Sequence, residues 1–338
     1  MINADGLAYV VFERRDVATM GKFLIDFGFM QAGQEGKSTY FRGFGDLPYC
    51  VELIASERDA FLGFGLGAAR SDDLNKFAEY AGITPIDREQ PGGGLMVRLT
   101  DPGGFQVDLV HGMAPVAVQN PRDLIVQKNT PWEKERVNMT VRPPAGPAPV
   151  CGLGHVVLQF PDFEGTARWY MERFGFLPTD LFHVGGKTGS FGLGFFRFNR
   201  GSEPADHHSL AILAGPEPQL LHVSTETIDM DAVGQGQQHL RAQGYTHHWG
   251  IGRHVFGSQI FDYWKDPAGD EWEHYADGDV MTAEYPTGIH KLDRGGLWAW
   301  GDDLPASLRP PAPAPEEAPQ EVKDLVDALL AKPRPWLD

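Results

Sequence analysis

The sequence is poor in cysteine and in basic residues. Cys50 and Cys151 are its only two cysteines, which excludes a disulfide framework and favours a reducing compartment. The 29 basic residues are outnumbered by 46 acidic ones, so the formal net charge is −17. This deficit argues against binding to nucleic acid and to anionic membrane surfaces, because both attract positively charged proteins.

The sequence also lacks long apolar segments. No stretch approaches the roughly 20 apolar residues of a membrane helix, and no basic stretch followed by an apolar run opens the chain. We therefore expect a cytoplasmic protein that does not bind membranes. The 338 residues, of which 42% are hydrophobic and 22% charged, are typical of a globular protein with two domains.

An internal repeat divides the chain into two similar halves. GLAYVVFERRDVATMGKFLIDFGF (6–29) and GLGHVVLQFPDFEGTARWYMERFGF (152–176) both predict a strand, a polar turn, an amphipathic helix and a final aromatic–glycine–aromatic triplet. Further on, LMVRLTDPGGFQVDLVHG (95–112) and SQIFDYWKDPAGDEWEHYADG (258–278) both predict a β-hairpin around an Asp-Pro turn. Each half is thus predicted to run strand, helix, strands, helix, hairpin.

The repeat sets the expected domain boundaries. We expect an N-terminal domain at 1–120 and a C-terminal domain at 150–283, joined by a linker at 121–149 that is rich in proline and polar residues. Residues 284–338 form a proline-rich tail in which EVKDLVDALLAK predicts a short amphipathic helix.

The two halves differ at three strand positions that matter chemically. Alignment of the repeats places His155 opposite Tyr9, His222 opposite the neighbourhood of Phe64, and Glu273 opposite Asp108. Two imidazoles and a carboxylate form a facial triad that leaves coordination positions open on a divalent metal.

Each of these residues also has a structural interpretation. A single histidine in an apolar strand is often a hydrogen-bonded core residue, and a strand glutamate is often exposed to solvent. The coincidence of three ligand types in one half favours a metal site, but the residues alone leave both interpretations open.

The second half resembles a known family, the type I extradiol ring-cleaving dioxygenases of the vicinal oxygen chelate (glyoxalase–bleomycin resistance) superfamily. Four blocks in order carry the resemblance: the 152–176 segment quoted above, HHSLAI (207–212), LLHVSTE (220–226) and GRHVFGSQIFDYWKDPAGDEWE (252–273). The resemblance extends weakly into the first half, which lacks the ligands and is expected to be free of metal.

The resemblance implies a role for each site residue. His155, His222 and Glu273 match the family's metal ligands. The catalytic residues are matched by His208 as the acid–base histidine, by His254 as a histidine that contacts substrate or oxygen, and by Tyr263 as the tyrosine that binds a substrate hydroxyl. If HHSLAI is a strand, only one of His207 and His208 faces the pocket.

The implied fold is α+β, with two tandem vicinal oxygen chelate domains, each built from paired βαβββ modules that form a half-open barrel. The implied function is extradiol cleavage of a di- or trihydroxylated aromatic by O₂, dependent on Fe(II) or, as the alternative metal, on Mn(II). The expected partners are an aromatic diol and O₂. The protein is also expected to form a homo-oligomer. Two alternatives remain: a glyoxalase- or epimerase-like isomerase, and a metal-free protein that binds aromatic compounds.

Some residues do not fit this pattern. The family has an aliphatic or aromatic residue where this chain has Asp262, just before the tyrosine. His183, His239, His274 and His290 have no partner that the sequence identifies, and we expect them at the surface.

Overall fold

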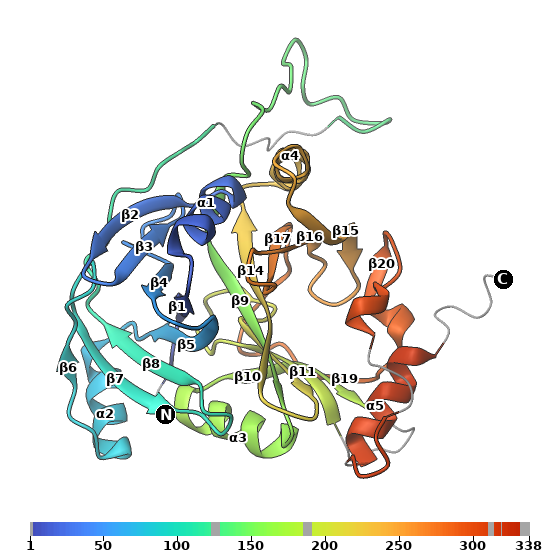
Figure 1. Ribbon diagram of the computed structural model, residues 1–338. Coiled ribbons are helices and arrows are strands. Elements are labelled where there is room, and N and C mark those ends of the chain that lie inside the picture. The colour runs from blue at the N-terminus through green and yellow to red at the C-terminus, as the bar shows by residue number, and fades with distance from the viewer. Residues whose placement is uncertain (1–2, 123–128, 185–190, 310–313, 319, 332–338) are drawn as a thin grey trace.

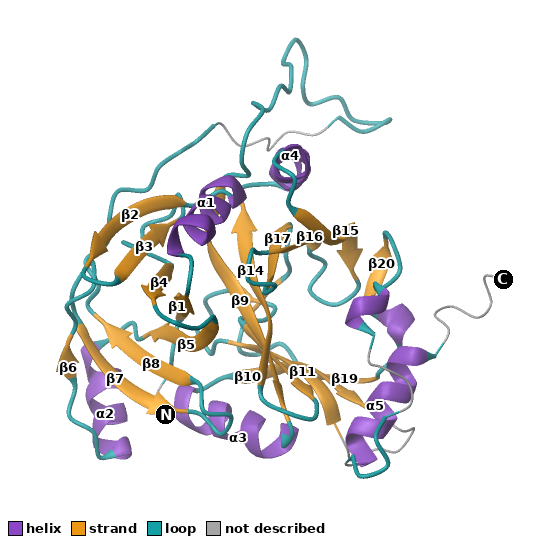
Figure 2. Ribbon diagram, in the orientation of Figure 1, coloured by secondary structure: helices purple, strands orange, loops and turns teal. Residues whose placement is uncertain are grey.

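The computed structural model describes residues 3–122, 129–184, 191–309, 314–318 and 320–331. Two large curved sheets lie side by side, with helices on their outer faces (Figures 1 and 2). The elements of the first half are β1 (Gly6–Arg14), α1 (Val17–Phe27), β2 (Met30–Glu35), β3 (Ser38–Arg42), β4 (Val51–Ala55), β5 (Ala60–Gly67), α2 (Ser71–Ala81), β6 (Ile86–Asp87), β7 (Leu95–Thr100) and β8 (Gln106–His111).

The second half repeats this order with small additions. Its elements are β9 (Val150–Phe160), α3 (Phe163–Phe174), β10 (Leu177–His183), β11 (Phe191–Arg197), β12 (Ala205–Asp206), β13 (Leu210–Ala214), β14 (Gln219–Thr227), α4 (Met230–Ala242), β15 (Thr246–His254), β16 (Ile260–Lys265), β17 (Glu271–Ala276) and β18 (Val280–Met281). The tail contributes β19 (Gly288–Lys291), η1 (Arg294–Gly296), β20 (Trp298–Trp300), η2 (Ala306–Leu308) and α5 (Gln320–Leu330).

The strand orders of the two sheets confirm the predicted α+β fold. The first sheet runs β2-β3-β4-β1-β5-β8-β7-β6, and the second runs β10-β11-β13-β9-β14-β17-β16-β15 with β19 and β20 added at its two edges. Each sheet therefore joins two βαβββ modules through the antiparallel pairs β1–β5 and β9–β14. Because β19 and β20 are strands of the second sheet, the beginning of the tail is part of the C-terminal domain's structure.

Matching helix caps explain why the two halves fold alike. The side chains of Asp16 and Asp162 accept hydrogen bonds from backbone N–H groups in the first turns of α1 and α3. Gly28 and Gly175 end these helices with φ angles of 123° and 74°, which a side chain would disfavour. The aromatic–glycine–aromatic triplets are thus helix C-terminal signals, as predicted.

The two halves share one hydrophobic core. Phe27 of α1 and Trp272 of β17 are fully buried, with ring centroids 5.9 Å apart. Arg14 bridges the halves by donating to Asp266, the buried first residue of the predicted Asp-Pro turn. The first half therefore supports the strands that carry the candidate ligands. Within the described part of the chain, no helix has the length and apolar composition needed to cross a membrane.

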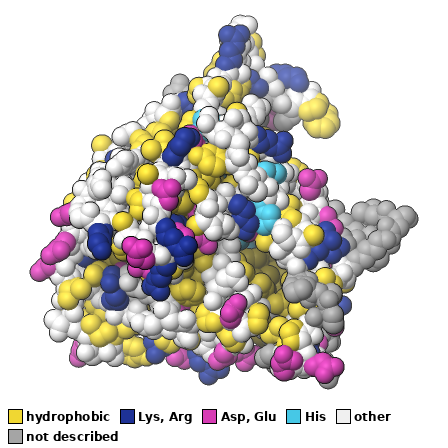
Figure 3. All heavy atoms as spheres, viewed as in Figure 1, with side chains coloured by type: hydrophobic (Ala, Val, Ile, Leu, Met, Phe, Trp, Pro, Cys, Tyr) yellow, Lys and Arg dark blue, Asp and Glu magenta, His cyan; other side chains and the backbone are white. Residues whose placement is uncertain are grey.

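Figure 3 shows basic and acidic side chains interspersed on one face of the molecule. The two cysteines are free thiols, with Cys50 buried and Cys151 half-buried.

Candidate active site

Three neighbouring strands bring His155, His222 and Glu273 together. They lie on β9, β14 and β17, which are adjacent in the sheet. Ser224 of β14 pairs with both His155 and Glu273, and its small side chain leaves space between them. One ligand atom from each of the three residues lies within 4.8 Å of the others.

The individual distances describe a compact cluster. The Nε2 atom of His155 lies 3.1 Å from Glu273 Oε2 and 3.3 Å from His222 Nε2, and the latter lies 3.6 Å from the same carboxylate oxygen. His155 is 2% exposed and Glu273 is 0% exposed, so the carboxylate is removed from water.

The unpaired polar atoms of this cluster fit a cation. Among the described residues, neither oxygen of Glu273 has a hydrogen-bond partner, and neither does Nδ1 of His155. A buried carboxylate that accepts no hydrogen bond is costly, and a bound cation would offset that cost. Burial raises the pKa of Glu273, but the imidazoles of His155 and His254 outweigh it and hold this pKa well below its usual range. Burial lowers the pKa of His222 to about 4, which keeps its ring neutral, as a ligand must be.

His254 and Tyr263 stand beside this cluster on β15 and β16. Nδ1 of His254 lies 2.8 Å from the carbonyl oxygen of Leu297, which can only accept, so the proton is on Nδ1. Nε2 is then an acceptor for the Tyr263 hydroxyl at 2.9 Å, and it lies 3.6 Å from Glu273 Oε1. The tail therefore fixes the tautomer of His254 through Leu297.

The expected strand placement of the histidine pair is wrong. His207 and His208 precede β13, which begins at Leu210, and both rings are buried. Only His208 lines the cavity described below, but the reason is packing in a loop and not strand alternation. Its ring centroid is 4.1 Å from that of His155. Burial and the neighbouring His155 and His207 hold the pKa of His208 well below its usual range.

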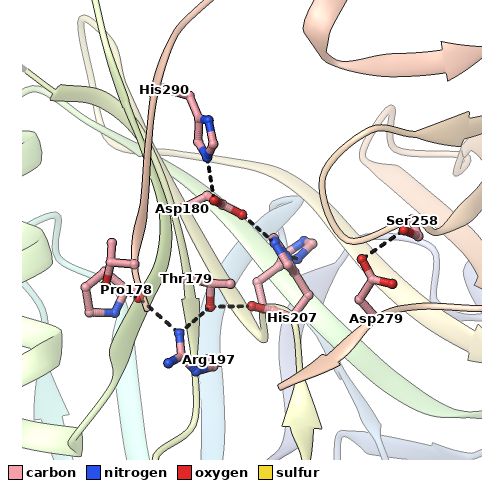
Figure 4. A network of polar contacts seen from close by, with 10 residues as sticks. Pro178, Thr179, Asp180, Arg197, His207, Ser258, Asp279 and His290 are labelled. Carbon is pink, nitrogen blue, oxygen red and sulfur yellow. Dashed lines mark hydrogen bonds and ion pairs between the residues drawn. The ribbon is translucent and has the colours of Figure 1, made fainter. Parts of the chain in front are cut away.

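A polar network surrounds His207 and Asp180 (Figure 4). Nδ1 of His207 is 3.0 Å from Nδ1 of His208, and its Nε2 is 2.7 Å from Asp180 Oδ2. The other oxygen of Asp180 lies 2.6 Å from Nε2 of His290. Thr179 donates to the backbone carbonyl of His207 at 2.7 Å, which holds the loop in place.

The sequence analysis missed much of this environment. His290 was expected at the surface but lies on β19 beside Asp180, and His274 is fully buried with Nε2 2.6 Å from the carbonyl oxygen of Phe27. His239 is half-buried and has a partner that the sequence did not identify, because its Nε2 lies 3.3 Å from Oδ1 of Asp26. Asp262 is buried and accepts from the indole of Trp264, which explains a polar residue before Tyr263.

A cavity of about 620 Å³ opens onto the cluster. His155, His222, His208, His254 and Tyr263 line it together with many apolar side chains. Residues of the tail and of α5 complete its wall. The cavity falls in the range of about 300–1,000 Å³ that is usual for small-molecule sites.

The same positions of the first half hold no comparable ligand set among the described residues. Strand register gives the correspondences, because Gly65 joins Tyr9 to Asp108 as Ser224 joins His155 to Glu273. The register equates Tyr9 with His155, Gly63 with His222, Asp108 with Glu273, and Arg98 with Tyr263.

Asp108 is neutralised by protein groups in the first half. Its carboxylate accepts from the Tyr9 hydroxyl at 2.8 Å and from Arg98 Nε at 2.8 Å. The position opposite His222, expected near Phe64, is Gly63, whose φ of 150° and close approach to Gln106 exclude a side chain. A guanidinium thus supplies the positive charge that a metal would supply in the second half.

Comparisons with known proteins agree with this geometry. Metapyrocatechase 2 of Cupriavidus necator is 31% identical over 155 residues, 45% of this chain and 45% of that protein. The iron-dependent extradiol dioxygenase of Rhodococcus jostii (strain RHA1) is 29% identical over 164 residues, 47% of this chain and 53% of that protein. The chain thus spans about half the length of these two relatives.

Solved structures share the fold over most of the chain. The Mn(II)-bound glyoxalase from Novosphingobium aromaticivorans superposes with a TM-score of 0.74 and 23% identity, covering 95% of this chain and 97% of that one. Homoprotocatechuate 2,3-dioxygenase from Arthrobacter globiformis superposes with a TM-score of 0.73 and 18% identity, covering 90% of each chain.

The family model covers the segment that contains the three-residue cluster. The model of the Glyoxalase/Bleomycin resistance protein/Dioxygenase superfamily matches residues 152–274, the segment that holds both histidines and the carboxylate of the cluster. The second half of the chain is thus similar to the Glyoxalase/Bleomycin resistance protein/Dioxygenase superfamily, and the curated proteins similar to the chain include extradiol dioxygenases.

Proposed function

We propose that the protein is a non-heme Fe(II)-dependent extradiol dioxygenase that inserts both atoms of O₂ into a di- or trihydroxylated aromatic ring. The observation that carries the proposal is the cluster of His155, His222 and Glu273, in which neither oxygen of the buried carboxylate accepts a hydrogen bond from a described residue. Two relatives with this chemistry in their names support it.

The cluster suits a divalent transition metal. Two neutral imidazoles and a carboxylate leave a net charge of about +1 and open positions on one side. His155, His222 and Glu273 would hold Fe(II), which would supply Lewis acidity to the two hydroxyl oxygens of a chelating catechol, and so lower their pKa values, together with a binding position for O₂. Mn(II) suits the same ligands and is the alternative metal.

The other residues of the site act on the substrate. The Tyr263 hydroxyl donates to Nε2 of His254 at 2.9 Å beside Glu273, so the tyrosine oxygen can still accept a hydrogen bond from a substrate hydroxyl. His208 lies on the cavity wall against His155, where its free ring nitrogen accepts or returns a substrate proton. The apolar wall excludes water and strengthens each of these polar contacts.

An isomerase of the glyoxalase type is the second candidate, because a Mn(II)-bound glyoxalase shares the fold. It is less well supported, because the position of Asp108 in the first half is closed by Tyr9 and Arg98 and offers no ligand to a metal. A metal-free binding protein has no need of the unpartnered Glu273 carboxylate.

O₂ uptake separates these candidates. The protein is purified without oxygen, loaded with Fe(II) or Mn(II), and mixed with a panel of catechols while O₂ and product absorbance are recorded. A dioxygenase consumes one O₂ for each ring opened. Metal-dependent turnover without O₂ uptake would indicate an isomerase, and tight ligand binding without metal would indicate a binding protein.

The homo-oligomeric state and the cytoplasmic location stay predictions. Light scattering of the purified protein would measure its oligomeric state.

A further inference from the structure

The tail of the chain forms part of the wall of the active-site cavity. Leu304 and Leu308 around η2 line it, as do Val322, Leu325 and Leu329 of α5. The three α5 residues recur at helical spacing and are at most 8% exposed, so they form one buried face toward the body. This helix lies outside the segment 152–274 that matches the superfamily model.

The cavity is larger than one aromatic ring requires. Its volume of about 620 Å³ lies within the range of about 300–1,000 Å³ that encloses drug-sized ligands. A catechol bound at His155, His222 and Glu273 is a single ring and leaves part of this volume free. Apart from the histidines, the lining is mainly apolar, with side chains of the body such as Leu213 and those of α5.

The charges of the wall disfavour an anionic substituent. Apart from histidines, the described residues of the wall include two basic side chains, those of Lys265 and Arg309. Lys265 lies 3.4 Å from Glu271, and Arg309 donates to Asp303 at 3.1 Å, so both are neutralised by acids. Glu217 adds another negative charge. A carboxylate entering this space would lose its hydration without gaining a free cation.

We propose that the substrate is a catechol bearing a large uncharged apolar group, which the cavity holds between the body and α5. The inference rests on the proposed function and specifies its substrate class. The substituent gains by leaving water for an apolar wall, and α5 is the element that determines the size it can reach.

The substrate panel tests this directly. The Fe(II)-loaded protein is assayed with catechol, with a phenyl-substituted catechol and with a carboxymethyl-substituted catechol. We expect kcat/KM for the phenyl compound to exceed that for the carboxymethyl compound at least about tenfold, the scale set by differences in pocket contacts. Anaerobic calorimetry should give the same order of affinities. Equal or reversed preference with efficient cleavage would overturn the inference and leave the proposed function standing, whereas cleavage of no ring would refute both.

Variants of α5 test the role of the helix. Leu325→Trp adds a large ring to the cavity wall and should lower kcat/KM for the phenyl-substituted catechol at least about tenfold. The kcat/KM for unsubstituted catechol should change less than about threefold. Asp327→Trp is the matched control, because Asp327 is exposed on the same helix. Val326→Ala enlarges the cavity, so it should raise kcat/KM for catechols whose substituents are longer than phenyl. If Leu325→Trp lowers kcat/KM equally for catechol and for the phenyl-substituted catechol, and Val326→Ala raises kcat/KM for no substrate, α5 does not select substrates.

Discussion

Nδ1 of His207 lies 3.0 Å from Nδ1 of His208, and the carboxylate of Asp180 lies behind it. Burial raises the pKa of Asp180, but hydrogen bonds from His207 and His290 outweigh it and lower this pKa, so the carboxylate is ionised. It therefore accepts a hydrogen bond from the Nε2–H group of His207. Nδ1 of His207 is then an acceptor, and Nδ1–H of His208 donates to it. The arrangement leaves Nε2 of His208 unprotonated and free to act as a base.

The first prediction concerns His208 itself. His208→Phe should retain metal and bind a catechol anaerobically, because the three ligands lie elsewhere. Turnover should fall at least about a hundredfold, since general acid–base groups contribute about 10² to 10⁴ in rate. Metal analysis, anaerobic titration and O₂ uptake measure the three properties. Unchanged turnover would show that His208 moves no proton in the slow step.

The second prediction concerns His207, which positions His208. His207→Phe removes the acceptor for Nδ1–H of His208 and frees the ring to change tautomer. We expect kcat to fall about 10- to 100-fold, as for other supporting residues of metal sites, with KM and metal content nearly unchanged. His207→Asn offers an amide oxygen as acceptor and should recover part of the loss. Equal loss in both variants, or a loss of metal, would mean that His207 only supports the fold.

The repeated pattern made the fold predictable. The order of strand, helix and glycine C-cap appears in both halves and is set locally, so Gly28 could be interpreted without a structure. The ligand cluster could also be predicted from the repeat. Register in a duplicated sheet carries Tyr9 onto His155 and Asp108 onto Glu273, so the difference between the halves indicates the chemistry.

Contacts between distant segments could not be predicted in this way. Asp180, His207 and His290 come from β10, a loop and β19, and no sequence spacing relates them. His274 was assigned to the surface because its partner is a backbone carbonyl of the other half. The role of α5 in the cavity wall is equally long-range, since an amphipathic helix shows in sequence which face it buries but not what that face covers.

The third prediction concerns metal binding. Glu273→Gln removes the only charged ligand of the cluster and should lose most of the metal, because ligand charge contributes strongly to affinity. Asp108→Asn is the matched control, since it makes the same chemical change at the corresponding position of the first half. Metal analysis of the two purified variants decides the matter. Full metal and full activity in Glu273→Gln would make the ligand assignment wrong.

The fourth prediction is that the first half is needed for stability but not for the reaction. Asp108 is 0% exposed and is held by Tyr9 and Arg98. Tyr9→Phe removes one hydrogen bond to a buried carboxylate and Arg98→Met removes its cation, so each should lower the free energy of unfolding by about 1–3 kcal/mol. Urea unfolding followed by fluorescence measures this change.

Turnover of the folded variants should stay within about twofold of the original protein, because neither Tyr9 nor Arg98 lines the cavity and distant, independent sites act additively. Leu7→Ala serves as a comparison, since it destabilises the same half through packing alone. All three variants should then show reduced stability with normal kcat. A hundredfold loss of turnover in folded Tyr9→Phe, with Leu7→Ala normal, would reveal a second reactive site around Asp108. That result would also contradict the view that Arg98 replaced a metal there.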